Sequence, residues 1–172
     1  AVRFVSCGES DMAVSRYIAL FSSCSAEDLL LARSLSPSVE VHTTGCILLS
    51  VPESYEETAL VKITDSHIGS GRIHFAVAST RTSAFFAARQ APGTRIPPGQ
   101  EQKHLRPYPL ELLQHWDEEI GTDYLETLFR WGIRRFGELS DLPPQQLVSR
   151  LGQQGTFLQR LARGEDVKPL RN

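Results

Sequence analysis

Residues 36–51, SPSVEVHTTGCILLSV, combine two runs of alternating apolar residues with a central Thr-Thr-Gly. Alternation with a period of two is typical of strands, and a Gly between two such runs marks a turn. The stretch therefore predicts a β-hairpin in the centre of a sheet. A hairpin in this place commonly carries metal-binding carboxylates, but the one acidic residue here is Glu40, near its start.

The residues on either side of the hairpin predict further elements. A short strand is expected at 2–5 (VRFV). Ser25-Ala-Glu-Asp28 has the pattern of a capping box, which predicts a helix that starts near Ser25. After the hairpin, polar residues and the stretch 65–71 (DSHIGSG) predict a loop, interrupted by a brief strand at 59–63 (ALVKI).

A second strand and helix complete the first unit. The apolar stretch 73–78 (IHFAVA) predicts a buried strand, and the Ala and Phe content of 80–90 (TRTSAFFAARQ) predicts a helix packed on it. These elements make an α/β unit over residues 1–92. Five prolines and two glycines within the 19 residues 91–109 then predict a linker, which we place at 93–109.

The rest of the chain, residues 110–172, predicts short helices joined by glycine turns. Gly132 follows an apolar helical stretch and is expected to cap it. The next residues, GIRRFGEL (132–139), have the form of the second half of a helix-hairpin-helix element, whose backbone N–H groups point at a nucleic-acid phosphate. The fold class is therefore α+β, with a sheet unit followed by a small all-α module.

Composition sets limits on the function. A formal net charge of −2 is not typical of a nucleic-acid-binding domain, although residues 123–172 hold eight Lys or Arg against six Asp or Glu. No apolar run approaches the roughly 18 residues of a membrane span, and the N-terminal AVRFVSCGES lacks the features of a signal peptide. We therefore expect a cytoplasmic protein that does not enter a membrane.

Several motifs carry a resemblance to a known family. Residues 127–166 contain a Gly-Ile turn, Gly-Glu-Leu, Leu-Pro and Ala-Arg-Gly-Glu-Asp in the order found in the thumb of the Y-family (translesion) DNA polymerases. The hairpin resembles the palm of the same family at Ser36, Pro37, Val39 and Glu40. The resemblance implies a reduced palm-like α/β sheet unit followed by a small all-α thumb-like helix-hairpin-helix module, without fingers and little-finger domains.

The residues that hold metal ions in that family are replaced. Counting from Glu40 places the family's paired acids on Gly45 and Cys46 and its later Asp on Ser50. Two-metal phosphoryl transfer needs several anionic oxygens around the ions, so we expect no metal site, no cofactor and no polymerase activity. The Lys that contacts the triphosphate in the family falls on Phe85, while the family's Asn-Lys falls on Thr80 and Arg81.

Within the Y-family, the chain resembles the ImuB-type subgroup. It is catalytically inactive and acts in damage-induced mutagenesis, where it connects an error-prone polymerase and a RecA-like protein to the sliding clamp. The stretch VASTRTSAFFAARQAPG (77–93) and the later LRPYPLELL (105–113) resemble this subgroup. The resemblance thus implies a non-catalytic accessory in DNA repair that contacts DNA weakly through its backbone.

Candidate DNA-contacting residues lie around the two thumb-like hairpins. Asp117, Glu118 and Glu119 precede the first turn and should reduce the affinity for DNA, because they place three like charges where phosphate would approach. Trp131 and Phe136 are expected to be core residues. The expected contacts are the two turn glycines and three arginines: Gly121, Arg130, Gly132, Arg134 and Arg135.

Two other functions stay open. One is a metal-dependent phosphotransfer enzyme with relocated carboxylates, for which the candidates are Glu9, Asp11, Glu40 and Asp65. The other is a protein-interaction module that has lost DNA binding. In either case, palm surface that the fingers would cover favours a partner interface or a homodimer.

Overall fold

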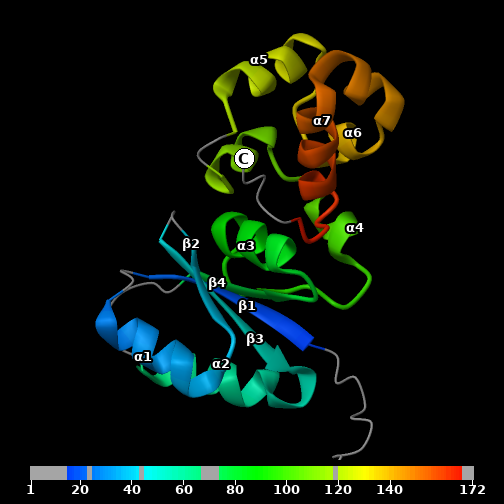
Figure 1. The fold of residues 1–172 in the computed structure, drawn as a ribbon. Coiled ribbons are helices and arrows are strands. Elements are labelled where there is room, and N and C mark those ends of the chain that lie inside the picture. The colour runs from blue at the N-terminus through cyan, green and yellow to red at the C-terminus, as the bar shows by residue number, and fades with distance from the viewer. Residues whose placement is uncertain (1–14, 23–24, 43–44, 67–73, 118–119, 168–172) are drawn as a thin grey trace, which may run out of the picture.

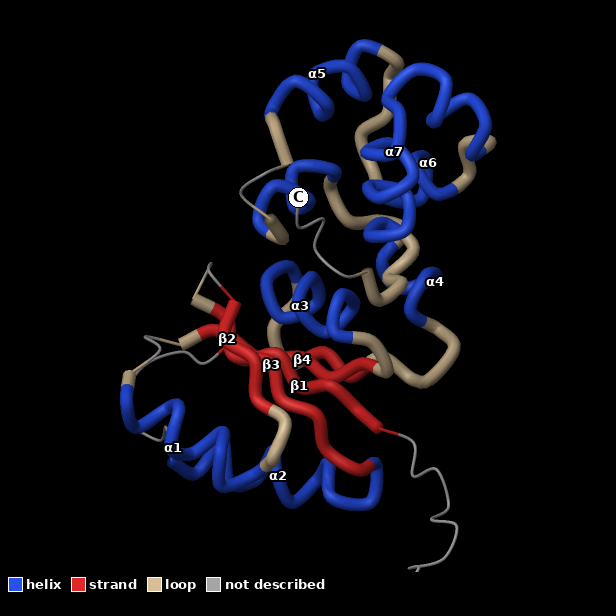
Figure 2. The backbone as a smooth tube through the Cα atoms, in the orientation of Figure 1, coloured by secondary structure: helices blue, strands red, loops and turns tan. Residues whose placement is uncertain are grey.

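The computed structural model describes residues 15–22, 25–42, 45–66, 74–117 and 120–167. Two helices cover one face of a sheet, a third helix covers the other face, and the remaining helices pack beyond that third helix (Figure 1). The strands lie in the order β2-β3-β1-β4-β5 (Figure 2), and all pairs are antiparallel except β4 with β5. Their bounds are Ser15–Phe21 for β1, Val39–His42 for β2, Cys46–Pro52 for β3, His74–Ala78 for β4 and Thr94–Arg95 for β5.

The predicted hairpin is confirmed. Strands β2 and β3 pair from Val39 opposite Leu49 to His42 opposite Cys46. Gly45 has φ +79°, a backbone conformation that side chains with a Cβ rarely adopt. Strand β3 is buried on both faces, because Ile47 and Leu49 face one hydrophobic cluster while Cys46 and Leu48 face another.

The central strand β1 is one that the sequence pattern did not predict. It pairs with β3 on one side and β4 on the other, and Ile18, Ala19 and Leu20 are all buried. A strand buried on both faces loses the polar alternation by which strands are recognised. The strand predicted at 2–5 lies outside the described residues.

Helices α1 (Ala26–Leu35) and α2 (Glu56–Ser66) cover the same face of the sheet. The capping box of α1 is confirmed, since the backbone N of Asp28 donates to Ser25 Oγ and the backbone N of Ser25 donates to Asp28 Oδ2. The brief strand predicted at 59–63 is wrong, because α2 occupies it after a 3₁₀ turn (Glu53–Tyr55). Of the loop predicted at 65–71, residues 65 and 66 belong to α2, and the others lie outside the described residues. The buried residues of α2, Ala59, Leu60 and Ile63, have helical spacing.

Helix α3 (Arg81–Gln90) lies on the opposite face, as predicted for this segment. Thr80 caps it by accepting a hydrogen bond from the Ser83 backbone N at 3.2 Å. Residues 82–88 are all buried. This burial on every side follows from the position of α3 between the sheet and the other helices (Figures 1 and 2).

The segment predicted as a linker, 93–109, has ordered elements of its own. It contains β5 and the short helix α4 (Glu101–Leu105), and the side chains of Ile96, Leu105 and Tyr108 are buried. Its prolines end each element early but do not prevent the apolar side chains between them from packing. Three side chains of the segment therefore belong to the core, while most of its other residues are exposed.

The helical part follows the predicted order of short helices and turns. Helix α7 bends at Gly152, where φ is +62° and ψ is −152°, while Gly155 packs tightly within its second half. One hydrophobic cluster includes Phe85 and Phe86 of α3 together with Leu128 and Leu158, so the core continues from the sheet into the helices. The elements are a 3₁₀ helix (Leu110–His115), α5 (Thr122–Arg130), α6 (Phe136–Ser140) and α7 (Pro144–Ala162). No described helix is long and apolar enough to cross a membrane.

Candidate nucleic-acid interface

Gly45, Cys46 and Ser50, on which the sequence resemblance places the family's carboxylates, lie just before strand β3 or within it. Phe21 at the end of β1 is opposite Cys46 at the start of β3, and Cys46 is opposite His42 at the end of β2. Cys46 is fully buried, and Ser50 lies farther along β3 opposite Tyr17. None of these side chains supplies the anionic oxygen that binds Mg²⁺ or a similar divalent ion.

Aromatic rings cover this part of the sheet. The Phe85 ring lies 5.3 Å from Phe21, 4.9 Å from His42 and 5.2 Å from Trp116, measured between ring centroids. His42 also lies 5.2 Å from Trp116. Phe21, His42, Phe85 and Trp116 are called the aromatic cluster below. The residues present do not fit a pair of metal ions, and the described part of the chain contains no group of three His, Cys, Asp or Glu suited to a metal.

His42 gives the aromatic cluster a pH dependence. Burial lowers the pKa of His42 below its ordinary value of 6.5, although Glu40 and Asp117 favour the charged form. The folded protein therefore favours the neutral imidazole, and the unfolded chain takes up a proton first as the pH falls. Stability due to this group is present above the unfolded pKa and is lost as the pH decreases below it.

We expect the free energy of unfolding, measured by urea denaturation, to decrease between about pH 7.5 and pH 5.5. His42→Phe should make this decrease smaller, because it keeps a ring and removes the titrating group. Burial also lowers the pKa of His115, with Arg89 acting in the same direction, so His115→Gln should remove a second, separate part of this decrease. An unchanged pH dependence in His42→Phe would contradict the assignment to His42.

The Gly132 turn has the predicted capping conformation. Gly132 has φ +84°, its N–H donates to Phe129 O, and the N–H of Ile133 donates to Leu128 O. This pair of bonds is a Schellman motif, which ends α5 and turns the chain toward α6. The other candidate glycine, Gly121, precedes α5 with an ordinary φ of −59°. Residues 118 and 119 of the first hairpin lie outside the described residues.

Backbone N–H groups after Gly132 were predicted to face a phosphate, but they have a partner within the chain. The N–H groups of Arg134 and Arg135 both donate to Glu138 Oε2, at 2.5 and 3.1 Å. These two bonds lower the pKa of the Glu138 carboxyl, which therefore stays charged. Since the carboxylate takes these donors, side chains rather than backbone N–H groups are left to contact phosphate.

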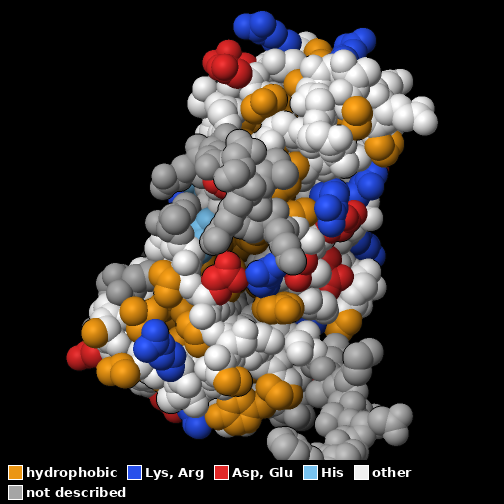
Figure 3. Space-filling view, in the orientation of Figure 1, with side chains coloured by type: hydrophobic (Ala, Val, Ile, Leu, Met, Phe, Trp, Pro, Cys, Tyr) orange, Lys and Arg blue, Asp and Glu red, His pale blue; other side chains and the backbone are white. Residues whose placement is uncertain are grey.

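The arginine side chains near Gly132 are exposed. Arg130 lies 3.9 Å from Glu126 one turn earlier on α5, and the Arg134 guanidinium lies over the Phe129 ring at 4.9 Å. Among the described residues, neither Arg134 nor Arg135 forms a salt bridge within 4 Å. Figure 3 shows Lys and Arg side chains, with acidic ones beside them, at the end of the molecule farthest from the sheet.

Arg150 was missed by the sequence reasoning. It lies on α7, 15 or more residues after the predicted arginines, yet its guanidinium lies over the Trp131 ring at 5.2 Å. Phe136 is fully buried as predicted, whereas Trp131 is half-buried and covered in part by Arg150. No local spacing in the sequence joins Arg150 to Trp131, because the bend of the chain through α6 brings them together.

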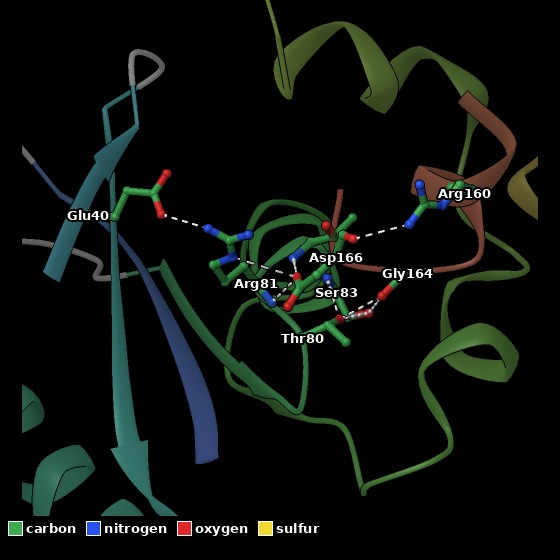
Figure 4. A network of polar contacts seen from close by, with 8 residues as sticks. Glu40, Thr80, Arg81, Ser83, Arg160, Gly164 and Asp166 are labelled. Carbon is green, nitrogen blue, oxygen red and sulfur yellow. Dashed lines mark hydrogen bonds and ion pairs between the residues drawn. The ribbon is translucent and has the colours of Figure 1, made fainter. Parts of the chain in front are cut away.

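The Ala-Arg-Gly-Glu-Asp segment, 162–166, joins the helical part to α3 (Figure 4). The Arg81 backbone N donates to Asp166 Oδ1 at 2.8 Å, and the Thr80 hydroxyl donates to the Gly164 carbonyl at 2.7 Å. Arg81 Nη1 also donates to Glu40 on β2 at 3.0 Å. Thr80 and Arg81, which occupy the positions of the family's Asn-Lys, therefore connect the sheet, α3 and the C-terminal segment.

Comparison with known proteins supports a Y-family polymerase-like fold. No protein-family model matches the chain, and no curated protein matches it. Among solved structures, the chain is similar to DinB from Sulfolobus solfataricus, with 18% sequence identity and a TM-score of 0.60. The match covers 84% of this chain and 44% of DinB, so the chain spans less than half of that protein. This confirms the fold that the sequence resemblance implied.

Proposed function

We propose that this chain is a non-catalytic Y-family polymerase-like protein of the ImuB type. It contacts DNA and binds other proteins as an accessory in DNA repair, translesion synthesis or damage-induced mutagenesis. The observation that supports the proposal is the aromatic cluster, because Phe21 packs against Phe85 and lies opposite Cys46, where the resemblance places a metal-binding acid of active relatives. A site filled by packed rings leaves no room for a nucleoside triphosphate and its ions.

The DNA contact in this proposal is weak and runs through phosphates. It uses the exposed side chains of Arg130, Arg134 and Arg135 beside the Gly132 turn. The carboxylates of Glu126 and Glu138 nearby reduce the local positive charge. The resemblance to the ImuB type suggests an error-prone polymerase, a RecA-like protein or a sliding clamp as protein partners.

Exposed apolar side chains support a protein-binding surface on the sheet unit. Leu30 on α1 is 68% exposed and Val41 on the edge strand β2 is 53% exposed. Figure 3 shows apolar side chains gathered over the part of the molecule that contains α1 and β2. Such a patch favours association with a partner protein or a second copy of the chain.

Fluorescence anisotropy with a primer-template DNA, measured over a salt series with and without Mg²⁺, tests the proposal. We expect binding without metal, and Arg134→Ala/Arg135→Ala should weaken it. Each lost phosphate contact should reduce the slope of log K against log salt by about 0.9, hence by about 2 for the double variant. Arg33→Ala/Lys62→Ala is the matched control, because it removes two exposed positive charges from α1 and α2.

The outcomes separate the functions. Equal losses in the two double variants would mean that net charge rather than the Gly132 region determines binding. No binding at low salt would remove the DNA role and leave a protein-interaction module. Strict dependence on Mg²⁺ would favour the enzyme with relocated carboxylates, of which Glu40 is paired with Arg81 in the structure.

A further inference from the structure

A small pocket opens beside the Gly132 turn, between the end of α5 and the first half of α7. Its volume is 180 Å³. Apolar side chains and one aromatic ring form most of its wall, and an amide and a guanidinium complete it. The lining residues are Trp131, Ile133, Leu142, Gln146, Leu147 and Arg150.

The polar groups of this pocket are available to a ligand. Arg150 and Gln146 are exposed, and among the described residues no carboxylate lies within salt-bridge distance of Arg150. Within the described part of the chain, a cation–π contact holds the Arg150 guanidinium over the Trp131 ring, and no salt bridge adds to it. Such a contact contributes little at an exposed position, so a flat ligand can displace the guanidinium from the indole.

We propose that this pocket takes one unpaired nucleobase of a bound DNA strand. The base stacks on the Trp131 indole, its edge bonds to the Gln146 amide, and Arg150 moves out to an adjacent phosphate. This inference rests on the proposed DNA contact and adds a base-binding site to it. Stacking on an aromatic side chain accepts any base, so the site has no sequence preference.

A nucleobase fits the pocket better than an apolar side chain of a partner protein. Indole, guanidinium and amide are the groups that bind single-stranded bases by stacking and by hydrogen bonding. The neighbouring Arg134 has no salt bridge among the described residues and can bind the phosphate next to that base. An apolar side chain would use Ile133, Leu142 and Leu147 but would leave the cations without partners.

The test compares two primer-template DNAs by fluorescence anisotropy. They have the same length and the same number of phosphates, and they differ in the single-stranded overhang, which carries either adenines or abasic sites. Because stacking of one base is worth roughly five- to hundredfold in affinity, the adenine overhang should bind at least fivefold more tightly. Trp131→Leu should bring this ratio close to one.

Two further variants make the result independent of whether Trp131→Leu folds. Gln146→Ala changes an exposed side chain and should also reduce the ratio, because it removes the amide that bonds to the base edge, with its fold checked by circular dichroism. Arg134→Ala/Arg135→Ala should weaken binding of both DNAs and keep the ratio. Trp131, one of two tryptophans, should be quenched by the adenine overhang, and the quenching should be absent in Trp131→Phe.

Equal affinity of the wild type for the two overhangs would overturn the base site while leaving the proposed DNA contact intact. In that case the pocket would be assigned to an apolar side chain of a protein partner. If neither DNA binds at low salt, the proposed DNA contact fails and the base site fails with it. A ratio that persists unchanged in both Trp131→Leu and Gln146→Ala would place any base contact elsewhere.

Discussion

Replacing Phe85 with alanine should lower the free energy of unfolding by about 3–5 kcal/mol. Phe85 is fully buried at the centre of the aromatic cluster, and its ring contacts Phe21, His42 and Trp116. Removing it leaves a cavity between the sheet and the helical part, where the surrounding rings can collapse only in part. A loss of this size is a large fraction of the 5–15 kcal/mol typical of a folded domain.

Phe85→Lys places the triphosphate-contacting residue of active relatives back in its position. We expect destabilisation at least as large as for alanine and no gain of nucleotide binding, because the ammonium group would be buried without an anion. Urea denaturation followed by circular dichroism measures the first effect, and calorimetric titration with a nucleoside triphosphate and Mg²⁺ measures the second. Leu30→Ala, at a position 68% exposed, is the control and should change stability by about 0.5 kcal/mol or less.

A stable Phe85→Lys protein would contradict this account of the aromatic cluster. It would show that the space over β1 and β3 is open enough to solvate a charge. If that variant also bound a nucleoside triphosphate, this part of the molecule would be an open cleft rather than a filled site. The proposal of a filled site requires that Phe85→Lys be strongly destabilised and that it bind no nucleoside triphosphate.

The second large effect is expected at Arg16. Its side chain is 4% exposed, and it donates to Glu56 Oε2 at 3.0 Å, to Ser79 Oγ at 2.8 Å and to the Ile96 carbonyl at 2.7 Å. These three bonds join β1 to α2, to the residue after β4 and to the segment after β5. Arg16→Ala should lower the free energy of unfolding by about 3–5 kcal/mol, because it leaves the Glu56 carboxylate largely buried without its cation.

Arg95 provides a matched control for Arg16. It bonds to Glu57 at 2.6 Å, but its side chain is 47% exposed and that of Glu57 is 70% exposed. Water solvates both groups after the pair is broken, so Arg95→Ala should have little effect. Equal losses for Arg16→Ala and Arg95→Ala, measured by urea denaturation, would contradict a role of burial in the strength of the Arg16 contacts.

The two large effects on stability arise in different parts of the molecule. Arg16 stabilises the sheet unit from within, whereas Phe85 joins that unit to the helical part.

Several features could be predicted from the sequence because they depend on local patterns. The alternation around Gly45 gives the hairpin, and the Ser25 and Asp28 side chains give the start of α1. Gly132 gives the end of α5. Each of these inferences involves residues within about 10 positions of one another, where chain geometry alone determines their relation.

Other features were decided by the tertiary structure. Strand β1 was not predicted because residues 18–21 are all apolar and show no alternation. Helix α2 contains the β-branched residues Val61 and Ile63, which favour a strand unless packing on a sheet face selects helical spacing. Glu138 takes the N–H groups that were expected to bind phosphate. The contacts of Arg150 with Trp131, and of Trp116 with His42, join residues distant in the chain. Such contacts follow from the packing of whole elements, so a local sequence pattern cannot predict them.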